Sequence, residues 1–205
     1  MEKTWQDWCQ SLPTPSLAQA LLGARIQVGN CSGLVVETEA YLGANDRAAH
    51  TYGLRHTPRN DALWQAPGTI YVYQMRQYYL LNFNVQPQGV PECLLIRALQ
   101  PEKGLATMAQ RRGQSGVALA NGPGKLTQAL NITRADDQTT LDTGRLQLTL
   151  SVRQPVQIAC GPRIGVPNKG AATTAPLRFW VAHNPYVSQK GARHDAETSA
   201  RQSWR

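Results

Sequence analysis

Two carboxylates and a phenol alternate in the segment VVETEAY, which spans residues 35–41. If this segment is a strand, Glu37, Glu39 and Tyr41 share one face, because successive side chains point to opposite sides. Charged groups are costly to bury unpaired, so this face must meet either water or a polar site. A carboxylate in a polar site can act as a general base. A solvated edge strand explains the same pattern, and for this motif alone we favour it.

Aromatic side chains gather further along the chain. Four of the seven tyrosines fall between positions 71 and 79, and Tyr71 and Tyr73 share one face of a predicted strand. An aromatic core would explain them, and so would a surface on which unpaired bases stack. The segment NDRAAH ends on His50. A single histidine is more often structural than catalytic, so His50 alone indicates no chemistry.

Charge is distributed unevenly over the 205 residues. The net charge is +8, and residues 1–96 contribute −1 while residues 97–205 contribute +9. This asymmetry indicates a polyanionic partner, although on charge alone a merely basic surface is about equally frequent. The four cysteines are widely separated, so neither a disulfide framework nor a zinc site is expected. No apolar run is long enough for a membrane helix or a signal peptide, and we expect a cytoplasmic protein.

Short strands dominate the pattern, and helices interrupt them irregularly. Predicted strands span residues 24–29, 33–41, 68–74, 92–99, 145–152 and 177–183, with a turn at 30–33 between the first two. Predicted helices follow Thr14-Pro15, with Thr14 as the N-cap, and cover 103–113 and 125–130. We therefore predict an α+β fold, a single compact domain with a curved, largely antiparallel sheet flanked by short helices. Residues 1–13 and 190–205 are expected to be loose termini, and the sequence gives no positive sign of oligomerisation.

Eight sequence blocks resemble one known family in order and in spacing. They are VETEAYLG (36–43), the AAH ending at His50, TPRN (57–60), PGTIYVY (67–73), RALQPEKG (97–104), NGPGKLTQAL (121–130), PRIGV (162–166) and LRFWV (177–181). Together they are similar to the alkyladenine (3-methyladenine) DNA glycosylases, the group without a helix-hairpin-helix motif. The resemblance covers residues 17–188.

The resemblance implies a role for each matching residue. Glu39 would activate the hydrolytic water, held by Arg97 and the backbone carbonyl of Ile164. Tyr41 would stack on one face of a flipped base and His50 with Tyr73 on the other. Further pocket residues would be Tyr71 and the backbone around Ala48 and His50, which would read the purine edge. Lys125 would contact a DNA phosphate, with Arg55 and Arg59 as further candidates.

The implied reaction is base release from double-stranded DNA. The substrates would be alkylated or deaminated purines of the 3-methyladenine, 7-methylguanine, hypoxanthine and ethenoadenine class, flipped out of the duplex at the start of base excision repair. A carboxylate can stabilise an oxocarbenium-like state and deprotonate water, so no metal or cofactor is expected. No lysine matches the place of Glu39, which favours a monofunctional hydrolase. Stacking a cationic base between two tyrosines adds about 0.5–2 kcal/mol.

The chain departs from the family after YVY, where a wedge tyrosine followed by glycine is usual. Here the sequence reads QMRQYYLLNFN. Without a gap Arg76 takes the wedge position, whereas a one-residue deletion places Met75 there, and Tyr78 is a third candidate. The same deletion makes Asn82 the asparagine that screens guanine; without it, Asn84 is nearest.

Two other functions remain open from the sequence. A nucleic-acid-binding protein could have kept the scaffold and lost catalysis, but it would not need a carboxylate facing phosphates. A hydrolase of free nucleosides would need neither the basic half nor a wedge. Base release from lesion-bearing duplexes would separate these alternatives.

Overall fold

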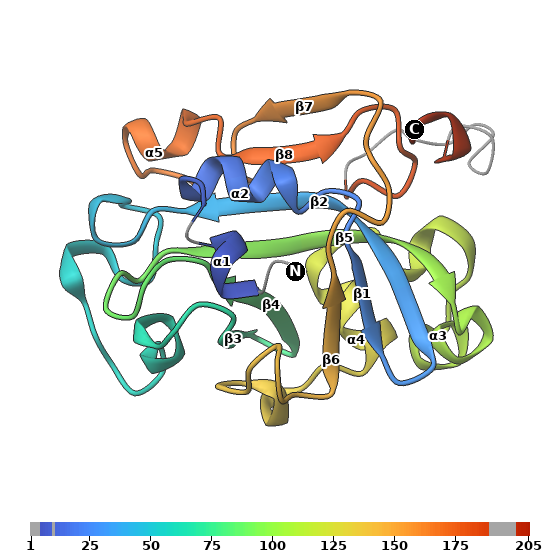
Figure 1. Ribbon diagram of the computed structural model, residues 1–205, viewed down its shortest axis with the longest axis horizontal. Helices are drawn as coiled ribbons and strands as arrows, with labels where there is room; N and C mark the ends of the chain where they lie inside the picture. The colour runs from blue at the N-terminus through green and yellow to red at the C-terminus, as the bar shows by residue number, and fades with distance from the viewer. Residues whose placement is uncertain (1–4, 10, 189–199) are drawn as a thin grey trace.

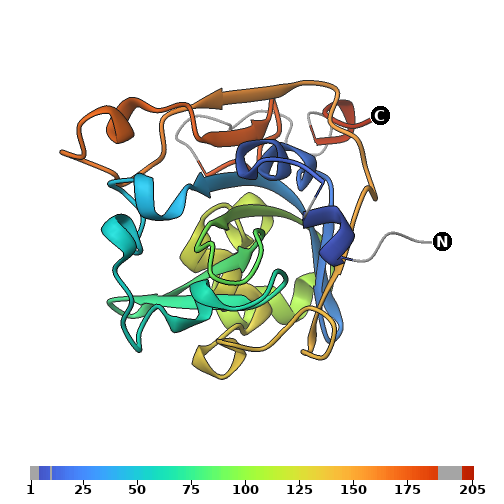
Figure 2. The same cartoon turned by 60° about the vertical axis from the view of Figure 1, so that its left-hand side comes forward.

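Strands from both halves of the chain form one curled, largely antiparallel sheet with short helices around it (Figures 1 and 2). The structure is a computed structural model, and it describes residues 5–9, 11–188 and 200–205. Within these residues the strand order is β3-β4-β5-β2-β1-β6, and β8 pairs with both β2 and β7. The predicted α+β single domain with a curved sheet is confirmed.

The elements have the following bounds. The strands are β1 (Arg25–Val28), β2 (Cys31–Tyr41), β3 (Ile70–Met75), β4 (Tyr78–Asn84), β5 (Cys93–Lys103), β6 (Leu146–Thr149), β7 (Ile158–Gly161) and β8 (Arg178–Val181). The α-helices are α1 (Trp5–Cys9), α2 (Thr14–Ala20), α3 (Leu105–Arg112), α4 (Pro123–Leu130) and α5 (Ala171–Thr174). Short 3-10 helices are η1 (Gly43–Asn45), η2 (Tyr52–Leu54), η3 (Asp61–Trp64), η4 (Gly116–Leu119) and η5 (Arg134–Asp136).

Strand β2 lies inside the sheet, so the solvated edge strand favoured for its motif is wrong. It pairs with β5 along one side, and on the other side with β1 in its first half and with β8 from Glu37 to Glu39. Both glutamates are fully buried. The sequence pattern could not show this burial, because the arginines that pair with Glu37 lie about 60 and 140 residues further along the chain.

Local turn chemistry differs from the prediction at two points. The β1–β2 turn is Gly29-Asn30, because Val28 pairs with Cys31 and Gly29 takes the positive φ of 56° that the turn requires. The N-cap of α2 is Pro13, and the Thr14 hydroxyl donates to Glu92 instead of capping the helix. Strands β4 and β7 were not predicted, since β4 does not alternate between buried and exposed positions and β7 has only four residues.

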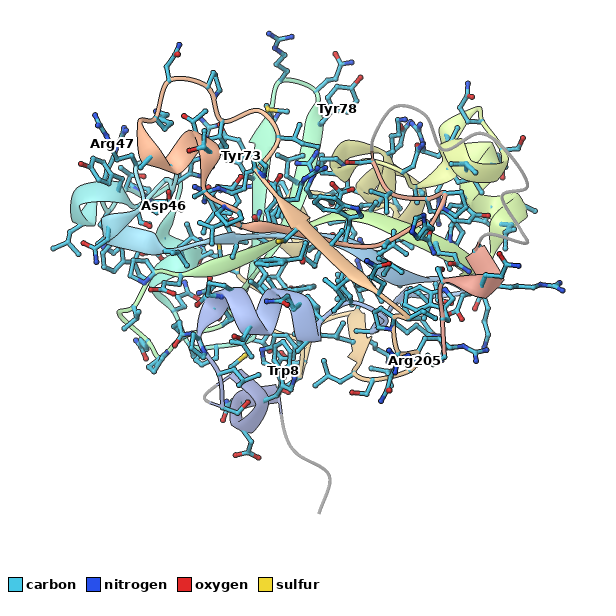
Figure 3. The ribbon with its side chains drawn as sticks, turned by 90° about the horizontal axis from the view of Figure 1, so that it is seen from above. Trp8, Asp46, Arg47, Tyr73, Tyr78 and Arg205 are labelled. Carbon is cyan, nitrogen blue, oxygen red and sulfur yellow. The ribbon has the colours of Figure 1, made fainter. Side chains whose placement is uncertain are left out.

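The β3–β4 hairpin rises from one face of the molecule (Figure 3). Met75 pairs with Tyr78 across a two-residue turn, and Arg76 in that turn has a φ of 56°. Helix α4 supports the hairpin, because the Tyr78 ring packs on Gly124, where an added Cβ would come within about 3.0 Å of ring atoms. The glycine of the GPGK motif therefore permits this contact.

The described parts of both termini pack against the domain. Trp5 and Cys9 of α1 are buried, and Trp204 donates from its indole nitrogen to Gln100 at 2.9 Å. These segments differ from the loose termini expected, while residues 1–4, 10 and 189–199 lie outside the described residues. Cys9, Cys31 and Cys93 are buried core residues and Cys160 is exposed. In the part of the chain that the structure describes, no helix is both long and apolar enough to cross a membrane.

Candidate active site

A pocket of about 340 Å³ opens beside the hairpin, within the size range of small-molecule sites. Its walls come from β2, β3, β4, β5, the loop that contains His50 and the loop that contains Ile164. The sequence-predicted residues that line it are Tyr41, Ala48, His50, Tyr71, Tyr73, Met75, Asn82, Arg97 and Ile164. Segments from across the chain thus converge on one cavity, mostly apolar with a few polar groups.

The Glu39 carboxylate lies directly behind this lining and is fully buried. Its Oε1 accepts from the backbone N–H of Ile164 at 2.8 Å and lies 3.2 Å from Nη1 of Arg97. Its Oε2 accepts from the Tyr41 hydroxyl at 2.9 Å. Burial raises the pKa of Glu39 above its ordinary value, although Arg97 and the two hydrogen bonds oppose that rise. The group is therefore a fixed carboxylate with enhanced basicity.

Glu37 is the centre of a second buried charge network. Its Oε1 accepts from Nε of Arg97 and Nη1 of Arg178, both at 3.1 Å. Ser188 donates its backbone N–H to Oε2 at 2.7 Å and its hydroxyl to Oε1 at 2.9 Å. Arg97 is the extra residue of a β-bulge in β5, between the pairs Glu37–Ala98 and Thr38–Ile96. The bulge lets one guanidinium reach both glutamates of β2.

Arg163 packs its guanidinium against the ring of Tyr41. Its guanidinium carbon lies 4.6 Å from the Tyr41 ring centroid, and its side chain is fully buried. Asp46 pairs with it through both carboxylate oxygens and also accepts from the N–H of Ala48 at 3.0 Å. Burial alone would raise the pKa of Asp46, but the bonds from Arg163 and Ala48 outweigh burial and lower it. This pair ties the Tyr41 wall to the loop that carries Ala48 and His50.

The opposite wall is made of three stacked or bonded rings. His50 and Tyr73 have ring centroids 4.3 Å apart, and Nδ1 of His50 lies 3.0 Å from the Tyr71 hydroxyl. Burial lowers the pKa of His50, and the charges of Arg59 and Arg55 lower it further. The imidazole is therefore held neutral at physiological pH, with one nitrogen bonded to Tyr71.

The two candidate asparagines occupy different places. Asn82 lines the pocket and donates to the carbonyls of Tyr71 and Leu80 at 3.1 and 3.2 Å. Asn84 is buried outside the lining, and its amide nitrogen donates to the carbonyls of Ala62 and Gln65. Cys93 also lines the pocket, and burial raises the pKa of its thiol to about 12.

The hairpin end carries the three wedge candidates. Met75 is 46% exposed and lines the pocket, and Tyr78 opposite it is 43% exposed. Figure 3 shows Tyr78 near the hairpin end and Tyr73 nearer the body, with Trp8 and Arg205 on the far side of the molecule. Lys125 of α4 donates to Asn121 at 2.8 Å and lies outside the pocket lining.

A second cavity of about 510 Å³ adjoins the first. The two cavities adjoin along residues that line both of them, namely Ala48, Ala49, His50, Tyr71 and Tyr73. The second cavity carries four basic side chains, Arg47, Arg55, Arg59 and Lys169. Arg55 and Arg59 therefore line the second cavity, whereas Lys125 lines neither cavity.

Sequence reasoning did not assign the supporting charges of the site. Arg163 and Arg178 fall inside the matching blocks PRIGV and LRFWV, but the pattern does not say which carboxylates they meet. Asp46 and Ser188 carried no recognisable signal. Among the described residues, no three His, Cys, Asp or Glu side chains gather in a way that could hold a metal ion.

Comparison with known proteins agrees with this geometry. The sequence model of the methylpurine-DNA glycosylase (MPG) family matches residues 7–185. A protein of Lactiplantibacillus plantarum named as a 3-methyladenine DNA glycosylase is 50% identical over 185 residues, 88% of each chain. Proteins of the same name from Staphylococcus saprophyticus and Staphylococcus aureus are each 46% identical over 181 residues, covering 86% of this chain and 89% and 90% of theirs.

The fold and the site thus define a DNA-repair glycosylase, a hydrolase of N-glycosyl bonds. The chain belongs to the methylpurine-DNA glycosylase family.

Proposed function

We propose that this protein is a monofunctional glycosylase that flips alkylated or deaminated purines out of duplex DNA and releases them by hydrolysis. The substrate class would be 3-methyladenine, 7-methylguanine, hypoxanthine and ethenoadenine. The single observation that carries this proposal is the buried Glu39 carboxylate, fixed by three donors at the back of an aromatic pocket. We further propose that the protein acts as a monomer on cytoplasmic DNA.

Binding would place the purine between Tyr41 and the His50–Tyr73 pair. Tyr41 follows Glu39 by two residues on β2, so the same strand supplies a stacking face and the carboxylate. Ala48 and His50 line the pocket, and the backbone around them would read the edge of the base. Asn82, the asparagine in the lining, would crowd the 2-amino group of guanine and so protect normal guanine.

Hydrolysis would need one carboxylate and two groups that hold the attacking water. The C1′–N bond breaks with its electron pair passing to the purine, and the water oxygen bonds to C1′. Arg97 and the carbonyl of Ile164 hold the water, and Glu39 takes a proton from it. The carboxylate also stabilises the positive charge that develops on the sugar. A neutral lesion leaves as an anion and then takes up a proton, whereas a cationic alkylpurine leaves neutral.

The DNA would lie across the face from which the hairpin rises. Met75 is our first choice for the side chain that fills the gap in the duplex, because it is half exposed and also lines the pocket. An apolar wedge is adequate for such insertion. Lys125 on α4 and Arg55 at the second cavity would contact the phosphates, whereas the Arg59 guanidinium is held by the carbonyl of Gln74.

The deciding experiment is base release from duplexes that carry one hypoxanthine, 1,N6-ethenoadenine or 7-methylguanine. Wild-type protein should release the base and leave the strand intact until alkali is added. Glu39→Gln should abolish release and keep lesion binding, because the pocket survives without the general base. Binding without release by the wild type would indicate a non-catalytic binder, and release only from free nucleosides a nucleosidase. Substantial single-turnover release by Glu39→Gln would contradict the role of Glu39.

A further inference from the structure

Each tyrosine that we assign to stacking is also in contact with an arginine. The guanidinium carbon of Arg163 lies 4.6 Å from the Tyr41 ring centroid, and that of Arg59 lies 5.0 Å from the Tyr73 ring centroid. Neither arginine lines the base pocket. Arg59 lines the adjoining cavity, and Tyr73 lines both, so the Tyr73 ring stands between Arg59 and the space for the base.

The two arginines differ in how their charge is balanced. Arg163 is buried and is paired through both carboxylate oxygens with Asp46, so its charge is locally neutralised. Arg59 is exposed, and its hydrogen bond goes to the neutral carbonyl oxygen of Gln74 at 2.7 Å. Arg47, Arg55 and Lys169 add further positive charge to the same cavity. The Tyr73 side of the pocket therefore carries an excess of positive charge.

A cation on one face of an aromatic ring weakens the attraction of the other face for a second cation. Its field also acts directly on the base, across the thickness of one ring. A cationic alkylpurine is repelled by that field when it enters the pocket. A neutral purine is not repelled, and it gains stabilisation when the C1′–N electron pair passes to it and its charge becomes negative.

We infer that Arg59, through its contact with Tyr73, is a specificity determinant that favours release of neutral purine lesions over cationic ones. This inference rests on the proposed function and specifies which lesions of the proposed substrate class Arg59 favours. Cationic alkylpurines are the better leaving groups by their own chemistry. Arg59 reduces that advantage and extends the range of the enzyme to hypoxanthine and ethenoadenine.

The test compares second-order rate constants for base release, measured with the full-length protein below saturation, so that binding and chemistry both count. The substrates are matched duplexes that carry 7-methylguanine or hypoxanthine. Arg59→Gln should raise the ratio of the 7-methylguanine to the hypoxanthine rate constant about three- to tenfold. Any general loss of DNA affinity cancels in this ratio.

Two control variants distinguish the effect of the Arg59–Tyr73 contact from that of the positive charge in the cavity. Arg55→Gln removes the same charge from the same cavity, at a side chain that is not over the ring, and should raise the ratio less than Arg59→Gln does. Arg59→Lys keeps the charge and should hold the ratio within about twofold of the wild type. An unchanged ratio in Arg59→Gln would overturn the inference, as would an equal rise in Arg55→Gln. Failure of the wild type to release any lesion would instead refute the proposed function.

Discussion

The hydroxyl of Tyr41 donates to Oε2 of Glu39 at 2.9 Å, so a residue of the pocket wall is hydrogen-bonded to the proposed general base on the same strand, β2. Burial raises the pKa of Glu39, and this hydrogen bond is one of the contacts that lowers it. A base must be ionised to act, so release should fall as pH drops through that raised pKa. The residue that we propose to stack on the base therefore also lowers the pKa of the proposed general base.

Replacing Tyr41 by Phe should therefore shift the acidic limb of the rate–pH profile to higher pH. The ring remains for stacking while the hydrogen bond to Glu39 is lost, so the rate deficit should grow as pH falls. Single-turnover rates on the hypoxanthine duplex over a pH series would measure the shift. Tyr41→Ala, which also removes the stacking face, should lose rate at every pH. An unshifted limb in Tyr41→Phe would show that the bond does not tune Glu39.

Glu37→Gln should move the same limb in the opposite direction. The Glu37 charge is one of the causes that raise the pKa of Glu39, so removing it should lower that pKa. An amide oxygen can still accept from Arg97 and Arg178, which preserves most of the network. Ser188→Ala removes one donor to Glu37 without removing charge and serves as the control. A limb that moves to higher pH would contradict this electrostatic account.

Asp46→Ala should destabilise the fold by about 3–5 kcal/mol, because it leaves the buried Arg163 charge without its partner. The Arg25–Glu102 pair is a matched control, since its side chains are 30% and 22% exposed. Glu102→Ala should cost about 0–1 kcal/mol, as expected for a partly exposed pair. Denaturant unfolding of both variants gives the comparison, and equal losses would count against a special role for the Asp46 pair.

Met75→Ala should slow the release of well-paired lesions more than poorly paired ones. Unstacking a base step costs a few kcal/mol, so a missing plug lowers the flipped population mainly where flipping is expensive. Release of hypoxanthine opposite thymine, compared with the same lesion in a mismatch, would measure this. Equal loss in both contexts would mean that Met75 only shapes the pocket. No loss in either would transfer the role to Arg76 or Tyr78.

Lys125→Ala should weaken binding to damaged and undamaged duplex alike. Each neutralised phosphate contributes about −0.9 to the slope of log affinity against log salt, so the slope should flatten by about one unit. Binding titrations at several salt concentrations would test this. Arg205→Ala, on the face opposite the hairpin, is the control and should leave the slope unchanged (Figure 3). A slope that Lys125→Ala does not alter would remove this lysine from the DNA contacts.

The sequence by itself determined the fold class, most of the strands and the family. Short runs rich in β-branched and aromatic residues, bounded by turn residues, located β1, β2, β3 and β8, and alternation located β6. The ordered blocks also indicated which residues would share a pocket, and the structure brings Tyr41, His50, Tyr73, Asn82 and Arg97 to one cavity. These features depend on local pattern or on motif order, which can be read along the chain.

Only the tertiary structure decided how the charges of the site are balanced. The alternating glutamates of β2 look the same on a solvated edge and in a buried network, since the pattern carries no information about partners distant in sequence. Asp46 meets Arg163 across 117 positions, and Glu37 meets Arg178 across 141. Burial raises the pKa of Glu39, and Arg97, which the bulge lets reach both glutamates, opposes that rise. Coulomb and desolvation energies depend on distance in space, and chain folding alone sets that distance.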